Sequence, residues 1–138
     1  MKSIPLPSFL CLPVWLAIAV VTMAKAAVAE FPQVPDKLVV LSFDDSAVSH
    51  ATHVGPLLKK LGFGATFFIT EGFNFTTNKK DYMTWEQIAE LHKAGFEIGN
   101  HTRRHTSVTR QNAGEIDSDV CYIEDQCLKH GIPKPTSF

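Results

Sequence analysis

Two short polar motifs in this 138-residue chain contain the residue types that metal chemistry requires. The first motif is Ser42–Asp45 (SFDD), and the second is Asn100–His105 (NHTRRH). Each motif follows directly on a short apolar run of the kind that forms a buried strand. Zinc sites that do chemistry typically use three protein ligands from His, Asp or Glu, and they leave one position open for water. Two carboxylates and two imidazoles can therefore supply three ligands and leave one carboxylate to act as a base.

The order of the predicted elements places both motifs at one end of a parallel sheet. Amphipathic helices are expected to alternate with the strands, and this alternation favours an α/β fold with parallel strands and crossover helices. In such folds, functional sites collect at the carboxyl ends of the strands, where Asp44, Asp45 and His101 stand. The strands are expected at 38–43, 65–69 and 96–99, with a fourth beginning at 136–138, and the helices at 50–61, 84–94 and 114–130.

The spacing of the two motif histidines places His105 one turn beyond His101 if the loop is helical, so that both imidazoles could face one ion. Each motif alone has an ordinary explanation, because an Asp-Asp pair often caps a turn and a His-x-x-x-His spacing occurs by chance. Their common position at strand ends favours metal binding. His50 is a rival for the third ligand because it lies close in sequence to Asp45. His53 is interpreted as a surface residue, and His92 and His130 are interpreted as solvated helix positions.

Spacing argues against three other kinds of site. The helix of a zinc protease has a Glu directly after its first His, where this chain has Thr102. Haloacid-dehalogenase-like phosphatases have two Asp residues separated by one position, whereas Asp44 and Asp45 are adjacent. Receiver domains have an acceptor Asp after the third strand, where this chain has Asn100-His101. The role of the two arginines at 103–104 stays open: they are either surface charges or groups that steer an acidic substrate.

The first 29 residues have the layout of a secretory signal peptide. Lys2 gives a weakly positive start, 9–23 is a nearly unbroken apolar run, and 27–29 (AVA) offers a small-x-small cleavage site. The alternative is an uncleaved membrane anchor, but the apolar run is shorter than the ~18 residues of a spanning helix and contains a proline. We therefore expect a linker at 30–36, a domain at 37–138, and a mature protein that is secreted or periplasmic and has no membrane attachment.

Composition and charge indicate an ordinary globular protein without a nucleic-acid partner. The formal net charge is -1, and no basic stripe or run of like charges is present. Cys121 and Cys127 stand six residues apart in an expected helix, which separates them by ~9 Å along its axis. This separation is beyond disulfide reach. Cys127 falls on the apolar face and is expected to be packed, and Cys121 could pair with a cysteine outside this chain.

The motifs and the sequence between them resemble the polysaccharide deacetylases with a NodB-homology domain. The resemblance runs over 37–138. Ser42–Asp45 looks like the first motif of the family, usually Thr-Phe-Asp-Asp, and His101–His105 looks like the second, His-(Ser/Thr)-x-x-His. The segments 65–69, 83–85 and 95–100 are also similar to the family.

This resemblance implies a role for each matched residue. Asp44 would be the general base, and Thr102 would brace the loop by hydrogen bonding. Asp45, His101 and His105 would bind a divalent metal, usually zinc, with cobalt or manganese as alternatives. The implied fold is an incomplete (β/α) barrel of the deacetylase type, comprising its first three to four βα units.

The implied activity is metal-dependent removal of N-acetyl groups from an N-acetylated glycan, such as chitin oligomers or peptidoglycan. The later motifs of the family include an aromatic-x-Pro segment, an acidic-Trp segment and a Leu-x-His that carries the general acid, and they do not occur in these 138 residues. We therefore expect a domain truncated at its C-terminal end, with weak or no turnover of its own. Two alternatives stay open: a non-catalytic, metal-containing glycan-binding module of the same fold, and a hydrolase of small amides or imides.

Overall fold

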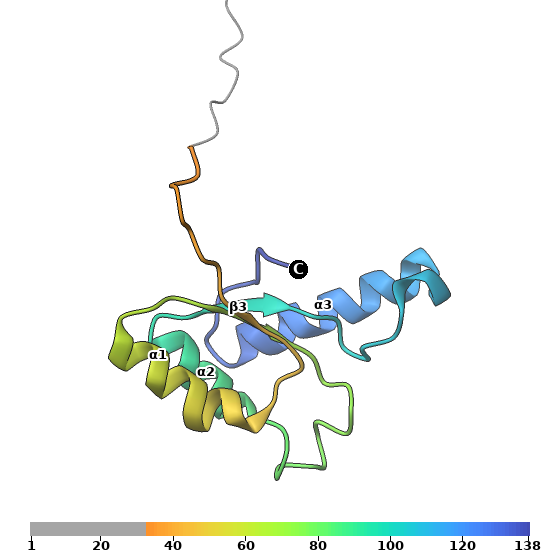
Figure 1. Cartoon of the computed structure of the whole chain (residues 1–138). Coiled ribbons are helices and arrows are strands. Elements are labelled where there is room, and N and C mark those ends of the chain that lie inside the picture. The colour runs from red at the N-terminus through yellow and green to blue at the C-terminus, as the bar shows by residue number, and fades with distance from the viewer. Residues whose placement is uncertain (1–32) are drawn as a thin grey trace, which may run out of the picture. The chain divides into compact units, whose positions relative to one another are not determined.

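Residues 33–138 are the part of the chain that the computed structural model describes, and Asp36–Phe138 form one compact unit. The signal peptide expected at 1–29 and the first residues of the linker expected at 30–36 lie outside the described residues. Helices and strands alternate along the described part (Figure 1). The predicted α/β class is therefore confirmed.

Three short parallel strands form the sheet, in the order β1-β2-β3. Phe43 on β1 pairs with Phe67 on β2, which pairs in turn with Ile98 on β3. Because the strands are parallel, their carboxyl ends lie at the same edge of the sheet, and both polar motifs leave the sheet at that edge. The strands are β1 (Ser42–Phe43), β2 (Thr66–Ile69) and β3 (Glu97–Asn100).

Helical segments connect the strands, and the longer helices begin and end at clear sequence signals. Thr84 and Gln87 form the predicted capping box at the start of α2, and Asn112 and Glu115 form another at the start of α3. Gly62 ends α1 with a left-handed φ of 73°. The helical segments are η1 (His50–Val54), α1 (Gly55–Leu61), α2 (Trp85–Lys93), η2 (Val108–Arg110) and α3 (Ala113–Lys129).

The helices cover the strands and close one hydrophobic core. Helices α1 and α2 lie side by side, and α3 lies next to β3 (Figure 1). Phe67 and Ile69 of the sheet are fully buried together with Ile88 of α2 and Ile123 of α3. None of the helices formed within residues 33–138 is long and apolar enough to cross a membrane.

Both cysteines in the described part are free thiols, as their spacing predicts. Cys127 is buried in the core, and this burial raises the pKa of its thiol to about 12. Cys121 is exposed on the other side of α3. Cys127 is therefore a packing residue, as predicted from its place on the apolar face.

The first predicted strand was too long. Only Ser42 and Phe43 form β1, and Leu38, Val39 and Val40 are 56%, 76% and 77% exposed. A strand needs a partner for its backbone groups, and within residues 33–138 no second strand borders this run on its free side. The apolar pattern at 38–40 therefore indicated burial that the described fold does not provide.

Two smaller predictions also differ from the structure. Leu57 and Leu61 were expected on the buried face of the first helix, but both are more than half exposed, because the short sheet covers only a narrow stripe of α1. Residues 136–138 do not form a strand, although the backbone N–H of Asn100 donates a 2.9 Å hydrogen bond to the carbonyl of Ser137. The end of the described chain therefore runs beside β3 through a single backbone contact.

Candidate metal centre

Asp45, His101 and His105 converge at the carboxyl edge of the sheet. The Oδ1 atom of Asp45 lies 3.5 Å from Nε2 of His101 and 3.2 Å from Nε2 of His105, and the two Nε2 atoms lie 3.2 Å apart. Among residues 33–138 these three form the one cluster of His, Cys, Asp and Glu side chains close enough to share an ion. The structure thus brings together the three residues that the sequence predicted as ligands.

The three distances are close to those between the ligand atoms of a tetrahedral ion. With metal–ligand bonds of about 2.0–2.2 Å, the ligand atoms of a tetrahedral site lie about 3.3–3.6 Å from one another. In addition, Oδ1 of Asp45 is buried and accepts no hydrogen bond among the described residues, although the two imidazole nitrogens lie 3.2 and 3.5 Å away. A buried carboxylate oxygen without a hydrogen bond is costly, and a bound cation would remove that cost. Two imidazole nitrogens and one carboxylate oxygen also form a donor set that leaves a fourth position open, as in catalytic zinc sites.

The loop that carries the two histidines is not helical. Thr102 and His105 hold left-handed φ angles of 61° and 52°, and the backbone, rather than one helical turn, brings the imidazoles together. The backbone N–H of Thr102 donates to Oδ1 of Asn100, whose Nδ2 donates to the carbonyl of Val120 on α3. The brace expected from Thr102 is thus made by its backbone N–H.

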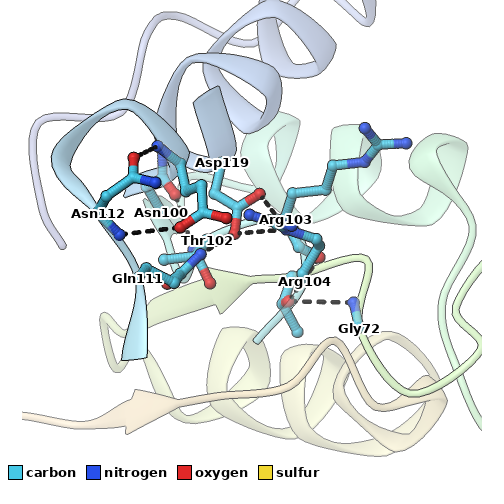
Figure 2. A network of polar contacts seen from close by, with 10 residues as sticks. Gly72, Asn100, Thr102, Arg103, Arg104, Gln111, Asn112 and Asp119 are labelled. Atoms are coloured by element: carbon cyan, nitrogen blue, oxygen red, sulfur yellow. Dashed lines mark hydrogen bonds and ion pairs between the residues drawn. The ribbon is translucent and has the colours of Figure 1, made fainter. Parts of the chain in front are cut away.

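Both arginines of this loop contact α3. Nε of Arg104 donates to both carboxylate oxygens of Asp119, at 2.9 and 3.1 Å, and the guanidinium of Arg103 lies 3.9 Å from the ring centroid of Tyr122. Asp119 is only 2% exposed, and it also accepts a 3.0 Å hydrogen bond from Nε2 of Gln111 (Figure 2). Arg103 and Arg104 are therefore anchors of the loop as well as surface charges.

Ser46 joins the acidic motif to the neighbouring strand. Its buried hydroxyl donates to the carbonyl of Thr70 at 2.8 Å and accepts from the N–H of Thr70 at 2.9 Å. Its own carbonyl accepts a hydrogen bond from the N–H of Met83. These bonds fix the turn that carries Asp45, whose φ of 70° is left-handed.

The loop after β2 forms one wall of the centre. The ring of Phe73 lies 4.5 Å from the ring of His105, centroid to centroid, and stacks on Tyr82 at 6.2 Å. Gly72 allows this approach, because a Cβ atom there would lie 2.8 Å from Cβ of His105 and 3.3 Å from the carbonyl oxygen of Arg104. The wall therefore depends on a residue without a side chain at position 72.

Asp44 and His50 take different positions relative to the cluster. Asp44 is exposed and follows β1 directly, beside Asp45. His50 is buried against the rings of Phe43 and Phe67, both at 5.6 Å, and is not part of the three-residue cluster. Burial lowers the pKa of His50, and the nearby carboxylates of Asp44 and Asp45 oppose that effect. The hypothesis of His50 as third ligand therefore receives no support, because the cluster is complete without it.

Sequence reasoning missed the residues that support the centre. Asp119 stands between Ile116 and Ile123 on the inward side of α3, and a carboxylate in that apolar series is the signal that could have identified it. His130, interpreted as a solvated position, is partly buried, and its ring stacks on Trp85 at 5.3 Å. No comparable sequence signal points to Ser46.

Residues 32–138 match the sequence profile of the polysaccharide deacetylase family. The chain belongs to this family. It is 32% identical over 84 residues to a bifunctional xylanase/deacetylase from Pseudobutyrivibrio xylanivorans, over 61% of this chain and 13% of that protein. It is 27% identical over 86 residues to a peptidoglycan-N-acetylglucosamine deacetylase from Bacillus cereus, over 62% of this chain and 37% of that protein.

The solved structure of a Streptococcus pyogenes deacetylase in complex with acetate is similar to the described fold. The TM-score is 0.60 at 23% identity, over 73% of this chain and 44% of that one. This similarity confirms the (β/α) barrel fold of the deacetylase type, which is present here in part. The chain spans less than half the length of each of these three relatives.

Proposed function

We propose that this chain provides the metal-binding part of a metal-dependent N-deacetylase that acts on N-acetylated glycans. Family membership supports a hydrolase of carbohydrate acetyl groups. The observation that carries the finer proposal is the spacing of Oδ1 of Asp45 and the two Nε2 atoms, all within 3.2–3.5 Å of one another. We propose zinc as the ion, with cobalt or manganese as alternatives.

The proposed mechanism divides the work among four residues. Asp45, His101 and His105 hold the ion through one oxygen and two nitrogens. Bound there, a divalent ion would polarise the acetamide carbonyl and lower the pKa of a coordinated water. Asp44, adjacent to Asp45 and exposed, accepts the proton of the attacking water on its carboxylate.

The reaction also requires a proton for the departing amine. The two imidazoles of the cluster are committed to the ion through Nε2, and Asp44 must be ionised to act as a base. The proposal therefore assigns the proton donor to a group other than these four residues. Turnover without that donor is expected to be slow. The layout of residues 1–29 further supports action outside the cytoplasm, on a cell-envelope or extracellular glycan.

Acetate release from chitin oligosaccharides and from peptidoglycan fragments tests this proposal. The chain is assayed in excess over substrate, after chelation and again after zinc is restored. We expect release only with zinc, no release by the His101→Ala/His105→Ala variant, and loss of release by Asp44→Asn with zinc binding retained. His53→Ala is the matched control, because His53 is an exposed histidine outside the cluster.

Three results would separate the alternatives. Release that persists under chelation, or that Asp44→Asn leaves unchanged, contradicts the mechanism. Zinc-dependent glycan binding without any acetate release favours a non-catalytic binding module. Hydrolysis of small amides or imides with no action on glycans favours the second alternative, a hydrolase of such small molecules.

A further inference from the structure

The loop between the two metal-cluster histidines has a shape that needs support from outside. It connects His101 to His105 without a helical turn, and Thr102 and His105 both hold left-handed φ angles. Such angles are unfavourable for residues other than glycine, and they persist where the surroundings fix them. The identity of those surroundings decides whether Nε2 of His105 is in place before an ion binds.

Arg104, the residue directly before His105, is held by an ion pair with a buried carboxylate. Its Nε donates to both oxygens of Asp119, a carboxylate whose side chain is 3% exposed. Gln111 donates a further hydrogen bond to the same carboxylate, so Asp119 is held from two sides (Figure 2). Hydrogen bonds between two charged groups are stronger than those between neutral groups.

Arg103 is held on both its backbone and its side chain. Its carbonyl accepts hydrogen bonds from the N–H of Glu71 at 3.1 Å and from Oγ1 of Thr70 at 3.2 Å. Its guanidinium lies over Tyr122, whose hydroxyl donates to Oε2 of Glu71 at 3.0 Å. Tyr122 and Asp119 stand three residues apart on one face of α3. One helix face therefore contacts two successive loop residues.

A buried ion pair is weak evidence for a gain in stability, because desolvation offsets much of the attraction. An apolar residue in place of Asp119 would suit the core beside Ile123 at least as well. The carboxylate does one thing that an apolar side chain cannot do, which is to fix the direction of Arg104 and the backbone that leads into His105.

We propose that Asp119 is a positioning residue for the metal centre. Through Arg104 it holds His105 with Nε2 3.2 Å from both Oδ1 of Asp45 and Nε2 of His101, so that the ion meets a preformed site. Outer residues of this kind typically change metal affinity 10–100-fold when they are lost. The inference rests on the metal-binding part of the proposed function.

The test compares zinc affinity in Asp119→Asn and Glu124→Gln, measured on the whole chain by competition with a chromophoric chelator. Glu124 is the matched control, since it lies on the same helix, is 14% exposed on its side chain, and pairs with Lys134 at 2.7 Å. We expect a zinc Kd about tenfold weaker for Asp119→Asn and an unchanged Kd for Glu124→Gln. The visible absorption of bound cobalt should also change for Asp119→Asn, because the positions of the ligands change.

Asp119→Asn is chosen because Arg104, whose side chain is 49% exposed, can turn to water when its partner is lost. A thermal unfolding curve shows whether the variant is folded, and the double variant Arg104→Met/Asp119→Asn provides a second measurement. If the two residues act as one unit, the double variant binds zinc no more weakly than Asp119→Asn alone.

Two outcomes would overturn the inference. Unchanged zinc affinity and an unchanged cobalt spectrum in Asp119→Asn, even with a lower unfolding temperature, reduce the pair to a structural contact while leaving the proposed function intact. Absence of zinc binding by the unmodified chain overturns both the positioning role and the metal-dependent function.

Discussion

Four residues that build or adjoin the metal cluster hold left-handed backbone angles, which glycine adopts most easily. The φ angles are 70° at Asp45, 56° at Ser46, 61° at Thr102 and 52° at His105. The loop after β2 adds two more, at Phe73 and Asn74. Strained residues concentrated at one place need a close-packed surrounding to hold them, and a small change in that packing should move a ligand.

Gly72→Ala tests this dependence. The added methyl group would lie 2.8 Å from Cβ of His105 and 3.3 Å from the carbonyl oxygen of Arg104, so the metal loop must shift. We expect a loss of about 1–3 kcal/mol in the free energy of unfolding and weaker zinc binding, measured by urea denaturation and chelator competition. Gly64→Ala is the control, because its Cβ would meet no atom within 4 Å. Equal effects of the two substitutions would contradict the close approach at Gly72.

His50 makes the stability of the fold depend on pH. Burial lowers the pKa of His50 below its ordinary value of 6.5, although Asp44 and Asp45 partly oppose this. Below pH 6.5 the unfolded chain therefore binds the proton more readily than the folded chain, and the free energy of unfolding falls until the pH passes the folded pKa. Above pH 6.5 this contribution is constant.

The variant His50→Phe isolates that contribution, because phenylalanine fills the space beside Phe43 and Phe67 but cannot bind a proton. Urea denaturation between pH 7.5 and 5.5, with chelator present, should show a smaller loss of stability in His50→Phe than in the unmodified chain. His53→Gln removes an exposed imidazole and should leave the slope as it is. Identical slopes for all three proteins would show that His50 titrates normally.

At the scale of elements, local signals predicted the helices better than the strands. The capping box of Thr84 and Gln87 was predicted because both of its hydrogen bonds form within four residues. The prediction that Val39 and Val40 are buried was wrong, because burial of a strand depends on packing against residues that are distant in sequence. The apolar series of α3 correctly predicted Ile123 and Cys127 as buried, since periodicity alone defines a helix face.

The second capping box gives a test at this scale. The side chain of Asn112 accepts a hydrogen bond from the N–H of Glu115, and the side chain of Glu115 accepts one from the N–H of Asn112. We expect Asn112→Ala to lower the free energy of unfolding by about 1 kcal/mol, measured by urea denaturation. Ser118→Ala, an exposed change within α3, should alter it by no more than about 0.5 kcal/mol. A loss for Asn112→Ala no larger than that for Ser118→Ala would show that the cap contributes little.

At the scale of the whole molecule, the chemistry of the centre was predictable and its supports were not. Asp45, His101 and His105 were predictable as ligands from their residue types and from their position at strand ends. Asp119 and Gly72 act through contacts with residues that are distant in sequence, and those contacts exist only once α3 and the β2 loop have packed. A metal ligand can be recognised from its residue type, whereas a supporting residue can be recognised only from its contacts in the folded chain.

Within residues 33–138, the outer edge of β1 is unpaired and adjoins an exposed apolar run. Within residues 33–138, β1 is paired on one side only, by β2, and the adjoining Val39 and Val40 are 76% and 77% exposed. An exposed apolar run beside an unpaired strand edge is a template for pairing with another chain. We therefore expect the chain to self-associate through this edge as its concentration rises.

Sedimentation velocity from low to high micromolar concentration tests this expectation with two lysine substitutions. Val40→Lys places a charge next to the edge, where it opposes pairing of a second chain, and should reduce the associated fraction. Val34→Lys adds the same charge at a valine that is 74% exposed but lies outside the compact unit of Asp36–Phe138, and should leave association unchanged. An equal reduction by both variants would mean that added charge improves solubility in general, and that the edge of β1 has no special part in association.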